Sequence, residues 1–214
     1  MSPALSMIRK GWGRKGEVRE LVIATKNKKK LVELKRYLKG IKARIISLVE
    51  FKSSPRIAED GNTFKKNAIK KALVVSRFVK GLALADDSGL AVKAIGGAPG
   101  VRSSRFAGPR KSDRENNRKL LRLLTGVSLN ERQAKFVCAI AIADNGKTVK
   151  VIEESCKGLV ALSGKGGCGF GYDPLFLIPK YKKTFGELGL KVKDKMSHRS
   201  KALEKARAFL KKYL

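Results

Sequence analysis

The spacing of apolar and polar residues predicts alternating strands and helices from the start of the chain. A short apolar run at 21–24 is typical of a buried strand, and Leu31, Leu34 and Leu38 then recur at helical spacing. Residues 43–51 predict a second strand. The chain therefore opens as strand, loop, helix and strand.

A longer helix is predicted over 63–79, because its apolar residues fall on one face, and we expect Gly81 to cap it. The apolar run at 82–85 then predicts a buried strand. A further helix is predicted over 112–124.

The clearest local signal is a hairpin. Residues 135–144 and 147–156 have strand character and are joined by Asn145-Gly146, the dipeptide most typical of a two-residue turn. A last helix is predicted over 197–214, with Ser197 as its N-cap. The whole order of elements indicates a mixed α/β protein without regular βαβ alternation.

The length of 214 residues and a hydrophobic content of 43% predict one globular domain, which we expect to be bilobed over 20–214. No apolar stretch approaches the roughly 18 residues needed to cross a bilayer. Residues 1–19 predict a flexible basic extension without the apolar segment of a secretory signal. We therefore expect a cytoplasmic protein without a membrane partner. A transit peptide is the alternative, and the glycines in this extension argue against it.

The charge balance is extreme, with 49 Lys and Arg against 18 Asp and Glu and a formal net charge of +31. Such a field attracts polyanions, so nucleotides, phosphorylated substrates and RNA are candidate partners. The basic residues are spread along the chain, and a solvated surface adapted to a salty or polyanion-rich cell interior is the alternative explanation.

Two adjacent carboxylates, Asp86 and Asp87, directly follow the predicted strand at 82–85. Ligands of open α/β sheets bind at the carboxyl ends of strands, so we expect both side chains to emerge there, where hard oxygen ligands suit Mg²⁺. Glu59 supplies a further oxygen if it faces them. An Asx turn at 86–89 and helix capping by Glu59 are the alternatives.

Residues 25–30, TKNKKK, precede a predicted helix and suit a triphosphate. They combine a hydroxyl, an amide, several ammonium groups and the unpaired backbone N–H groups of a helix start. A solvated lysine face is the alternative, and the glycine spacing of a Walker loop is absent.

The glycine-rich loop at 163–173 allows close approach to a ligand. Its last residues offer an aromatic face for a base, from Phe170 and Tyr172, and a carboxylate to orient it, from Asp173. The single histidine, His198, lies at a predicted helix start among donors suited to an oxo or phosphate group.

The order of these motifs over residues 21–210 resembles the inosine triphosphate pyrophosphatase family. The residues that carry the resemblance are, in chain order, Thr25, Asn27, Lys30 and Glu33, then Glu59, Gly61, Thr63 and Phe64, then Asn67-Ala68 and Lys71-Ala72, then Asp86-Asp87-Ser88-Gly89-Leu90, then Gly96-Gly97-Ala98-Pro99-Gly100 with Ser103 and Arg105, then Gly169-Phe170-Gly171-Tyr172-Asp173-Pro174, and finally Ser197-His198-Arg199. Each motif is short, and the specificity comes from the complete ordered set.

The resemblance implies an elongated mixed β-sheet with flanking helices that form two lobes around a nucleotide cleft, and usually a homodimer. It implies that Glu59 and Asp87 bind Mg²⁺, with Asp86 in support and Asp87 as the proton acceptor for the attacking water. The phosphates would be held by Thr25, Lys26, Asn27, Lys28, Lys29 and Lys30. The other substrate-binding residues would be Lys71 and Ser88, with Phe170, Gly171, Tyr172, Asp173, Lys193, His198 and Arg199 around the base and its 6-oxo group.

The implied activity is hydrolysis of non-standard purine nucleoside triphosphates, such as ITP, dITP and XTP, to the monophosphate and pyrophosphate. Carboxylates that hold a metal and orient a water agree with the residues identified above, and donors placed for a 6-oxo group would reject adenine. One rival is a pyrophosphatase of similar fold for modified pyrimidines. Another is an RNA-binding protein, against which the acids kept among so many basic residues argue.

Overall fold

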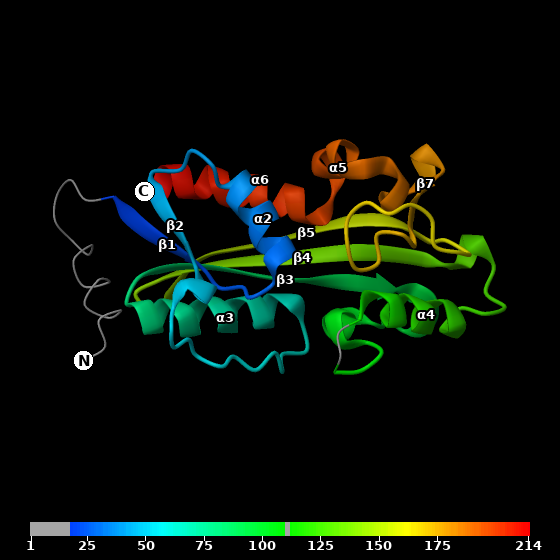
Figure 1. The fold of residues 1–214 in the computed structure, drawn as a ribbon, viewed down its shortest axis with the longest axis horizontal. Coiled ribbons are helices and arrows are strands. Elements are labelled where there is room, and N and C mark those ends of the chain that lie inside the picture. The colour runs from blue at the N-terminus through cyan, green and yellow to red at the C-terminus, as the bar shows by residue number, and fades with distance from the viewer. Residues whose placement is uncertain (1–17, 110–111) are drawn as a thin grey trace. The chain divides into compact units, whose positions relative to one another are not determined.

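The computed structural model describes residues 18–109 and 112–214 (Figure 1). The predicted extension at 1–19 lies outside the described residues up to position 17, and Arg19 already belongs to the first strand. The described strands are β1 (Arg19–Ile23), β2 (Ala43–Ser47), β3 (Leu82–Val92), β4 (Gln133–Asp144), β5 (Lys147–Val160), β6 (Phe176–Ile178) and β7 (Lys183–Thr184). The described α-helices are α2 (Lys28–Tyr37), α3 (Phe64–Val79), α4 (Asp113–Leu123), α5 (Phe185–Met196) and α6 (His198–Tyr213).

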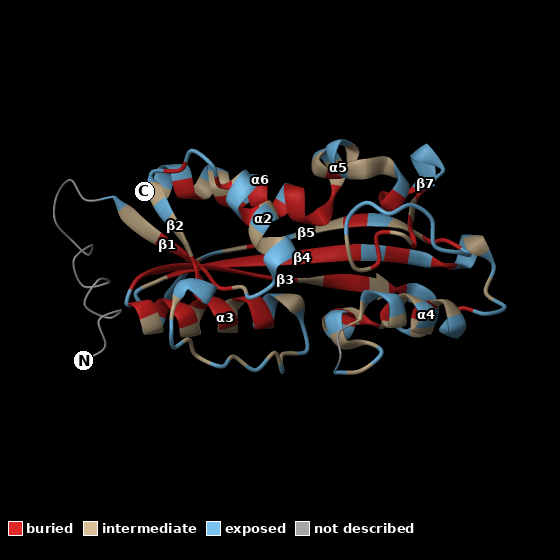
Figure 2. Cartoon of the chain, viewed as in Figure 1, coloured by how far each residue is buried: buried red, intermediate tan, exposed pale blue. Residues whose placement is uncertain are grey.

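The strands form one mixed sheet in the order β2-β1-β3-β4-β5-β6-β7. Strand β1 pairs in parallel with both β2 and β3, whereas β6 pairs antiparallel with β5 and β7. Strands β3 and β4 are buried along most of their length (Figure 2), which is typical of strands covered on both faces. The predicted α/β class, with a mixed sheet and flanking helices, is confirmed.

The chain divides into two compact units. Unit 1 extends to Asp87 and adds Ala139–Glu153 and Ala202–Leu214, and unit 2 comprises Ser88–Cys138 and Glu154–Lys201. The long strands β3, β4 and β5 therefore contribute residues to both units, and the boundary in β3 falls between two residues of the predicted site.

The core of unit 1 consists largely of small side chains. Alanines of β3 and β4 pack against the apolar face of α3, including Ala68, Ala72 and Val75. Figure 1 shows α3 on one face of the strands of this unit, with α2 and α6 on the other. Small side chains bring the helix close to the sheet, which places polar groups of α3 within reach of β3.

The core of unit 2 is aromatic. The ring of Phe176 lies 4.5 Å from that of Phe136 and 5.2 Å from that of Phe185, measured between centroids. In the same unit the buried guanidinium of Arg132 donates hydrogen bonds to the carbonyls of Leu124, Val127 and Ala161, which satisfies its own donors away from water.

Local signals predicted the hairpin and the cap at Ser197 correctly. Asn145 and Gly146 have φ of 47° and 77°, the positive values that the tight turn requires, and Ser197 accepts the amide of Ser200 at 3.1 Å. The expected C-cap at Gly81 is wrong, because Lys80 takes the left-handed conformation, with φ of 52°. The second strand ends at Ser47 rather than at 51, because its last residues form a 3-10 turn.

None of the helices in the described part of the chain is long and apolar enough to cross a membrane.

Candidate functional site

Asp86 and Asp87 lie inside β3, which continues to Val92, so the expectation that they emerge at a strand end is wrong. Neighbouring residues of a strand point to opposite faces, and the two carboxylates accordingly meet different helices. Lys30 of α2 lies 2.9 Å from Asp86, and Lys71 of α3 lies 2.9 Å from Asp87. Because each acid forms an ion pair with a lysine, both carboxylates can be buried within the strand.

The ammonium of Lys71 is the centre of the group in unit 1. It donates to Glu59 Oε1 at 3.0 Å and to Asp87 Oδ1 at 2.9 Å. One turn earlier on α3, Asn67 Nδ2 donates to Asp87 Oδ2 at 3.2 Å, while Asn67 Oδ1 accepts the amide of Gly61 at 2.8 Å. Asn67 thus joins the segment that carries Glu59 to the buried acid, and it is a residue that the predicted site set did not contain.

The charges in this group act against the effect of burial. Burial raises the pKa of Asp87, although Lys71 and Lys30 oppose the shift. Burial by itself lowers the pKa of Lys71, but the charges of Asp87, Asp86 and Glu59 outweigh it and leave that pKa raised. Lys71 therefore stays cationic, and Asp87 is a stronger proton acceptor than an exposed carboxylate.

The carboxylates of this group fit a hard divalent cation. Glu59 Oε1 and Asp87 Oδ1 already converge on one positive charge, the Lys71 ammonium. Within residues 18–109 and 112–214 no group of three or more His, Cys, Asp or Glu side chains is arranged to hold a metal ion. Mg²⁺ is often held by only one or two carboxylates, with phosphate oxygens and water as its other ligands. The donor set therefore suits a metal that arrives with a phosphorylated substrate.

The start of α2 is capped, contrary to expectation. Asn27 Oδ1 accepts the amides of Lys29 and Lys30 at 3.0 and 3.2 Å, and Thr25 Oγ1 accepts the amide of Asn27 at 3.2 Å. The backbone groups expected to be unpaired thus bind nearby side chains, as at an ordinary N-cap. The segment can still attract an anion through positive charge, since the predicted phosphate ligands Lys26, Lys28 and Lys29 are exposed.

A second polar group lies in unit 2 around Asp173. Its Oδ2 accepts from Lys193 Nζ at 2.6 Å and from the amide of Phe170 at 2.8 Å, and both charged side chains are buried. Burial raises the pKa of Asp173, and the charge of Lys193 opposes the shift. A Cβ at Gly169 would collide with Asp173 Oδ2, and Gly169 also has φ of 84°, so glycine alone fits this close approach.

The ring of Phe170 is the aromatic surface of this group. Lys193 Nζ lies 5.0 Å from its centroid, and the guanidinium carbon of Arg199 lies 5.3 Å from it. Arg199 also donates to Ser88 Oγ at 2.7 Å. An aromatic ring with two cationic donors beside it can stack a flat base while the donors bind an oxo group of that base.

Two further predicted base-binding side chains, Tyr172 and His198, are buried. Tyr172 is buried in the aromatic core, its hydroxyl donates to the carbonyl of Ser103 at 2.9 Å, and burial raises its pKa. The interpretation of Tyr172 as part of a stacking face is therefore wrong. His198 is also buried, with its ring 4.7 Å from that of Phe136 and nearly parallel to it.

The structure brings most of the predicted residues into two groups, one in each unit. Unit 1 brings together Lys30, Glu59, Lys71, Asp86 and Asp87, and unit 2 brings together Ser88, Phe170, Asp173, Lys193 and Arg199. In the chain, the Asp87-Ser88 peptide bond joins the two groups.

Known proteins resemble this chain along most of its length. The profile of the Ham1 family matches residues 21–209. A dITP/XTP pyrophosphatase of Desulforamulus reducens is 52% identical over 191 residues, which cover 89% of this chain and 95% of that protein. One from Rhodopirellula baltica is 48% identical over 185 residues, covering 86% and 89%. The solved structure of a HAM1 protein from Coxiella burnetii is 38% identical, with a TM-score of 0.84, and the match covers 91% of this chain and 99% of that one.

Proposed function

Because the chain belongs to the Ham1 family, we propose that it performs the reaction for which its relatives are named. It is a nucleoside triphosphate pyrophosphatase, and its substrates are the non-standard purine nucleotides ITP, dITP and XTP, which it removes from the nucleotide pool as monophosphate and pyrophosphate. The observation that carries this proposal is the Lys71 ammonium shared by Glu59 and Asp87 within a protein of net charge +31. Burying a carboxylate costs desolvation free energy, and a role in metal-assisted phosphate hydrolysis explains why two acids are placed here.

In this mechanism Asp87 accepts the proton of the water that attacks the phosphate chain. Its raised pKa, caused by burial, supports this role. Glu59 and Asp87 would hold Mg²⁺, which when bound neutralises phosphate oxygens, with Asp86 in support. Lys30 and the exposed lysines at the start of α2 draw in the triphosphate by charge, and Lys71 keeps the acids in place until it arrives.

The group around Phe170 holds the base. Phe170 stacks on it, Lys193 and Arg199 direct donors to the 6-oxo group, and Asp173 fixes Lys193. Adenine would bring a 6-amino donor toward these donors and leave them without an acceptor, which disfavours ATP. The buried His198 supports the start of α6, from which Arg199 extends. We further propose a homodimer that acts in the cytoplasm.

The decisive test is pyrophosphate release from ITP, XTP, ATP, GTP and dUTP, each measured with Mg²⁺ and with excess EDTA. We expect turnover of ITP and XTP at least about 100-fold above ATP, because a site built for one hydrogen-bonding pattern leaves its groups unpaired with the other. We also expect EDTA to abolish it. Preference for dUTP would favour the pyrimidine rival, and folded protein that is inactive on all five nucleotides would refute the proposal.

Nucleic acid binding is a second candidate function, favoured by one feature of α4. Arg114, Arg118 and Arg122 are exposed and four residues apart, so they form a row along one face of the helix with a spacing of about 6 Å. Guanidinium groups bind phosphates in a defined geometry, and such a row suits the repeating charge of a single strand.

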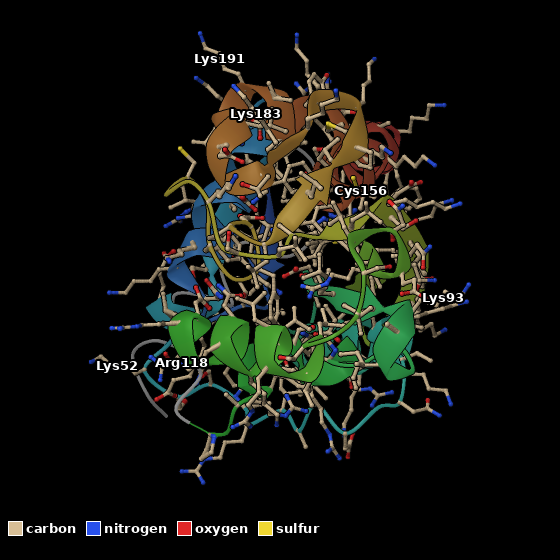
Figure 3. The ribbon with its side chains drawn as sticks, turned by 90° about the vertical axis from the view of Figure 1, so that its right-hand side faces the viewer. Lys52, Lys93, Arg118, Cys156, Lys183 and Lys191 are labelled. Atoms are coloured by element: carbon tan, nitrogen blue, oxygen red, sulfur yellow. The ribbon has the colours of Figure 1, made fainter. Side chains whose placement is uncertain are left out.

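The row is tested by replacing Arg114, Arg118 and Arg122 together with Gln. We expect the slope of log binding constant against log salt, measured with a labelled single-stranded RNA, to fall in magnitude by about 2, because each phosphate contact contributes about 0.7. The control replaces three exposed lysines of the same unit, Lys180, Lys183 and Lys191, with Gln; Figure 3 labels the last two at the surface. Equal loss in both triple variants would mean that only overall charge acts.

A further inference from the structure

Two side chains of α4 hold a single peptide unit in the loop that carries Phe170. Asp113 Oδ2 accepts the amide of Gly171 at 2.9 Å, and Asn117 Nδ2 donates to the carbonyl of the same residue at 3.0 Å. Asp113 and Asn117 are four residues apart and so lie on the same side of the helix. Gly171 has φ of 67°, a left-handed conformation, and α4 fixes both of its backbone polar groups.

The helix itself does not require these residue types. Asparagine is a poor helix former, yet α4 has two in succession, Asn116 and Asn117, in its interior. Asn116 is occupied with another segment, since it accepts the amide of Ala107 at 2.7 Å and donates to the carbonyl of Ser104 at 3.3 Å. The acid of Asp113 suits the first turn of any helix, but here its oxygen is bound to Gly171. Both asparagines thus bind segments outside the helix.

The residues on either side of Gly171 carry the base group. Phe170 precedes it, and Asp173, two residues after it, accepts the Phe170 amide. Between them, Tyr172 is anchored through its hydroxyl to Ser103. The direction of the Phe170 ring therefore depends on the backbone at Gly171, and that backbone depends on α4.

We infer that Asp113 and Asn117 are positioning residues that hold Phe170 in the orientation for stacking a base. They touch neither phosphate nor base themselves and act through Gly171. The inference rests on the proposed function, because it takes the Phe170 group as the base site.

The test measures ITP hydrolysis by Asp113→Ala and Asn117→Ala. Each variant loses one hydrogen bond, so we expect KM to rise about five-fold with kcat nearly unchanged, since stacking holds the base equally in the ground and transition states. Asp113→Asn keeps an acceptor for the Gly171 amide and should restore a KM near that of the wild type. Leu123→Ala, at an exposed position at the end of the same helix, is the control.

Amide hydrogen exchange at Gly171 provides a readout independent of turnover. We expect this amide to exchange at least about ten-fold faster in Asp113→Ala than in the wild type or in Asp113→Asn, because its acceptor is gone. Unchanged KM in both alanine variants, with an active wild type, would overturn the inference and leave the proposed function intact. A wild type inactive on every nucleotide would overturn the proposed function and the positioning role with it.

Discussion

Asp87→Asn is expected to reduce ITP turnover by at least about 1,000-fold while the protein stays folded. The amide has nearly the same size and can still accept from Lys71, but it cannot take a proton from water, and it binds a metal ion more weakly than a carboxylate. The substitution takes one counter-ion from the buried Lys71 ammonium, but the charges of Asp86 and Glu59 still act on it, so we expect a moderate loss of stability that leaves the protein folded. Steady-state pyrophosphate release and urea unfolding measure the two effects separately.

The matched control for this variant is Asp60→Asn. Asp60 also pairs with a lysine of α3, at 2.7 Å from Lys70 Nζ, but the pair is exposed, so its loss changes little. We expect this control to hydrolyse ITP at a rate close to that of the wild type. Turnover by Asp87→Asn within a few-fold of the wild type would remove Asp87 from the mechanism.

Lys193→Met is expected to cause the largest loss of stability, about 3 to 5 kcal/mol in free energy of unfolding, because it leaves the buried carboxylate of Asp173 without its ammonium. The loss depends on pH. Burial already raises the pKa of Asp173 in the folded protein, and removing Lys193 raises it further. A group with a raised folded pKa stabilises the fold below its unfolded pKa and loses that contribution as pH rises through the folded value. The variant should therefore approach the wild type at acidic pH.

A double variant separates stability from base selection. Asp173→Asn/Lys193→Met leaves no buried charge in the pair, while the amide oxygen can still accept from Phe170, so we expect most of the lost stability to return. The preference for ITP over ATP should be lost in both the single and the double variant, because each lacks the donor of Lys193. Lys191→Met, at an exposed position of the same helix, is the control for the substitution itself. A double variant as unstable as Lys193→Met would show that packing, and not charge, explains the loss.

The sequence by itself determined the elements that depend on near neighbours. The helix at 63–79, the hairpin at Asn145-Gly146 and the cap at Ser197 follow from periodicity, turn preference and a local hydrogen bond. The ordered motifs also identified the family, because their residues stand at fixed places along the chain.

Only the tertiary structure decided which polar groups meet. Asp86 and Asp87 can lie within β3 because each pairs with a lysine. These lysines, Lys30 and Lys71, come from two separate helices, so the pairs form only when the helices pack on the sheet. Tyr172 points into the core because Ser103 accepts its hydroxyl there. Two adjacent asparagines in a helix indicate contacts outside it, but the sequence does not name the partners, which in α4 lie up to 54 positions away. Local preference cannot specify such contacts, because their energy is gained only when distant segments pack together.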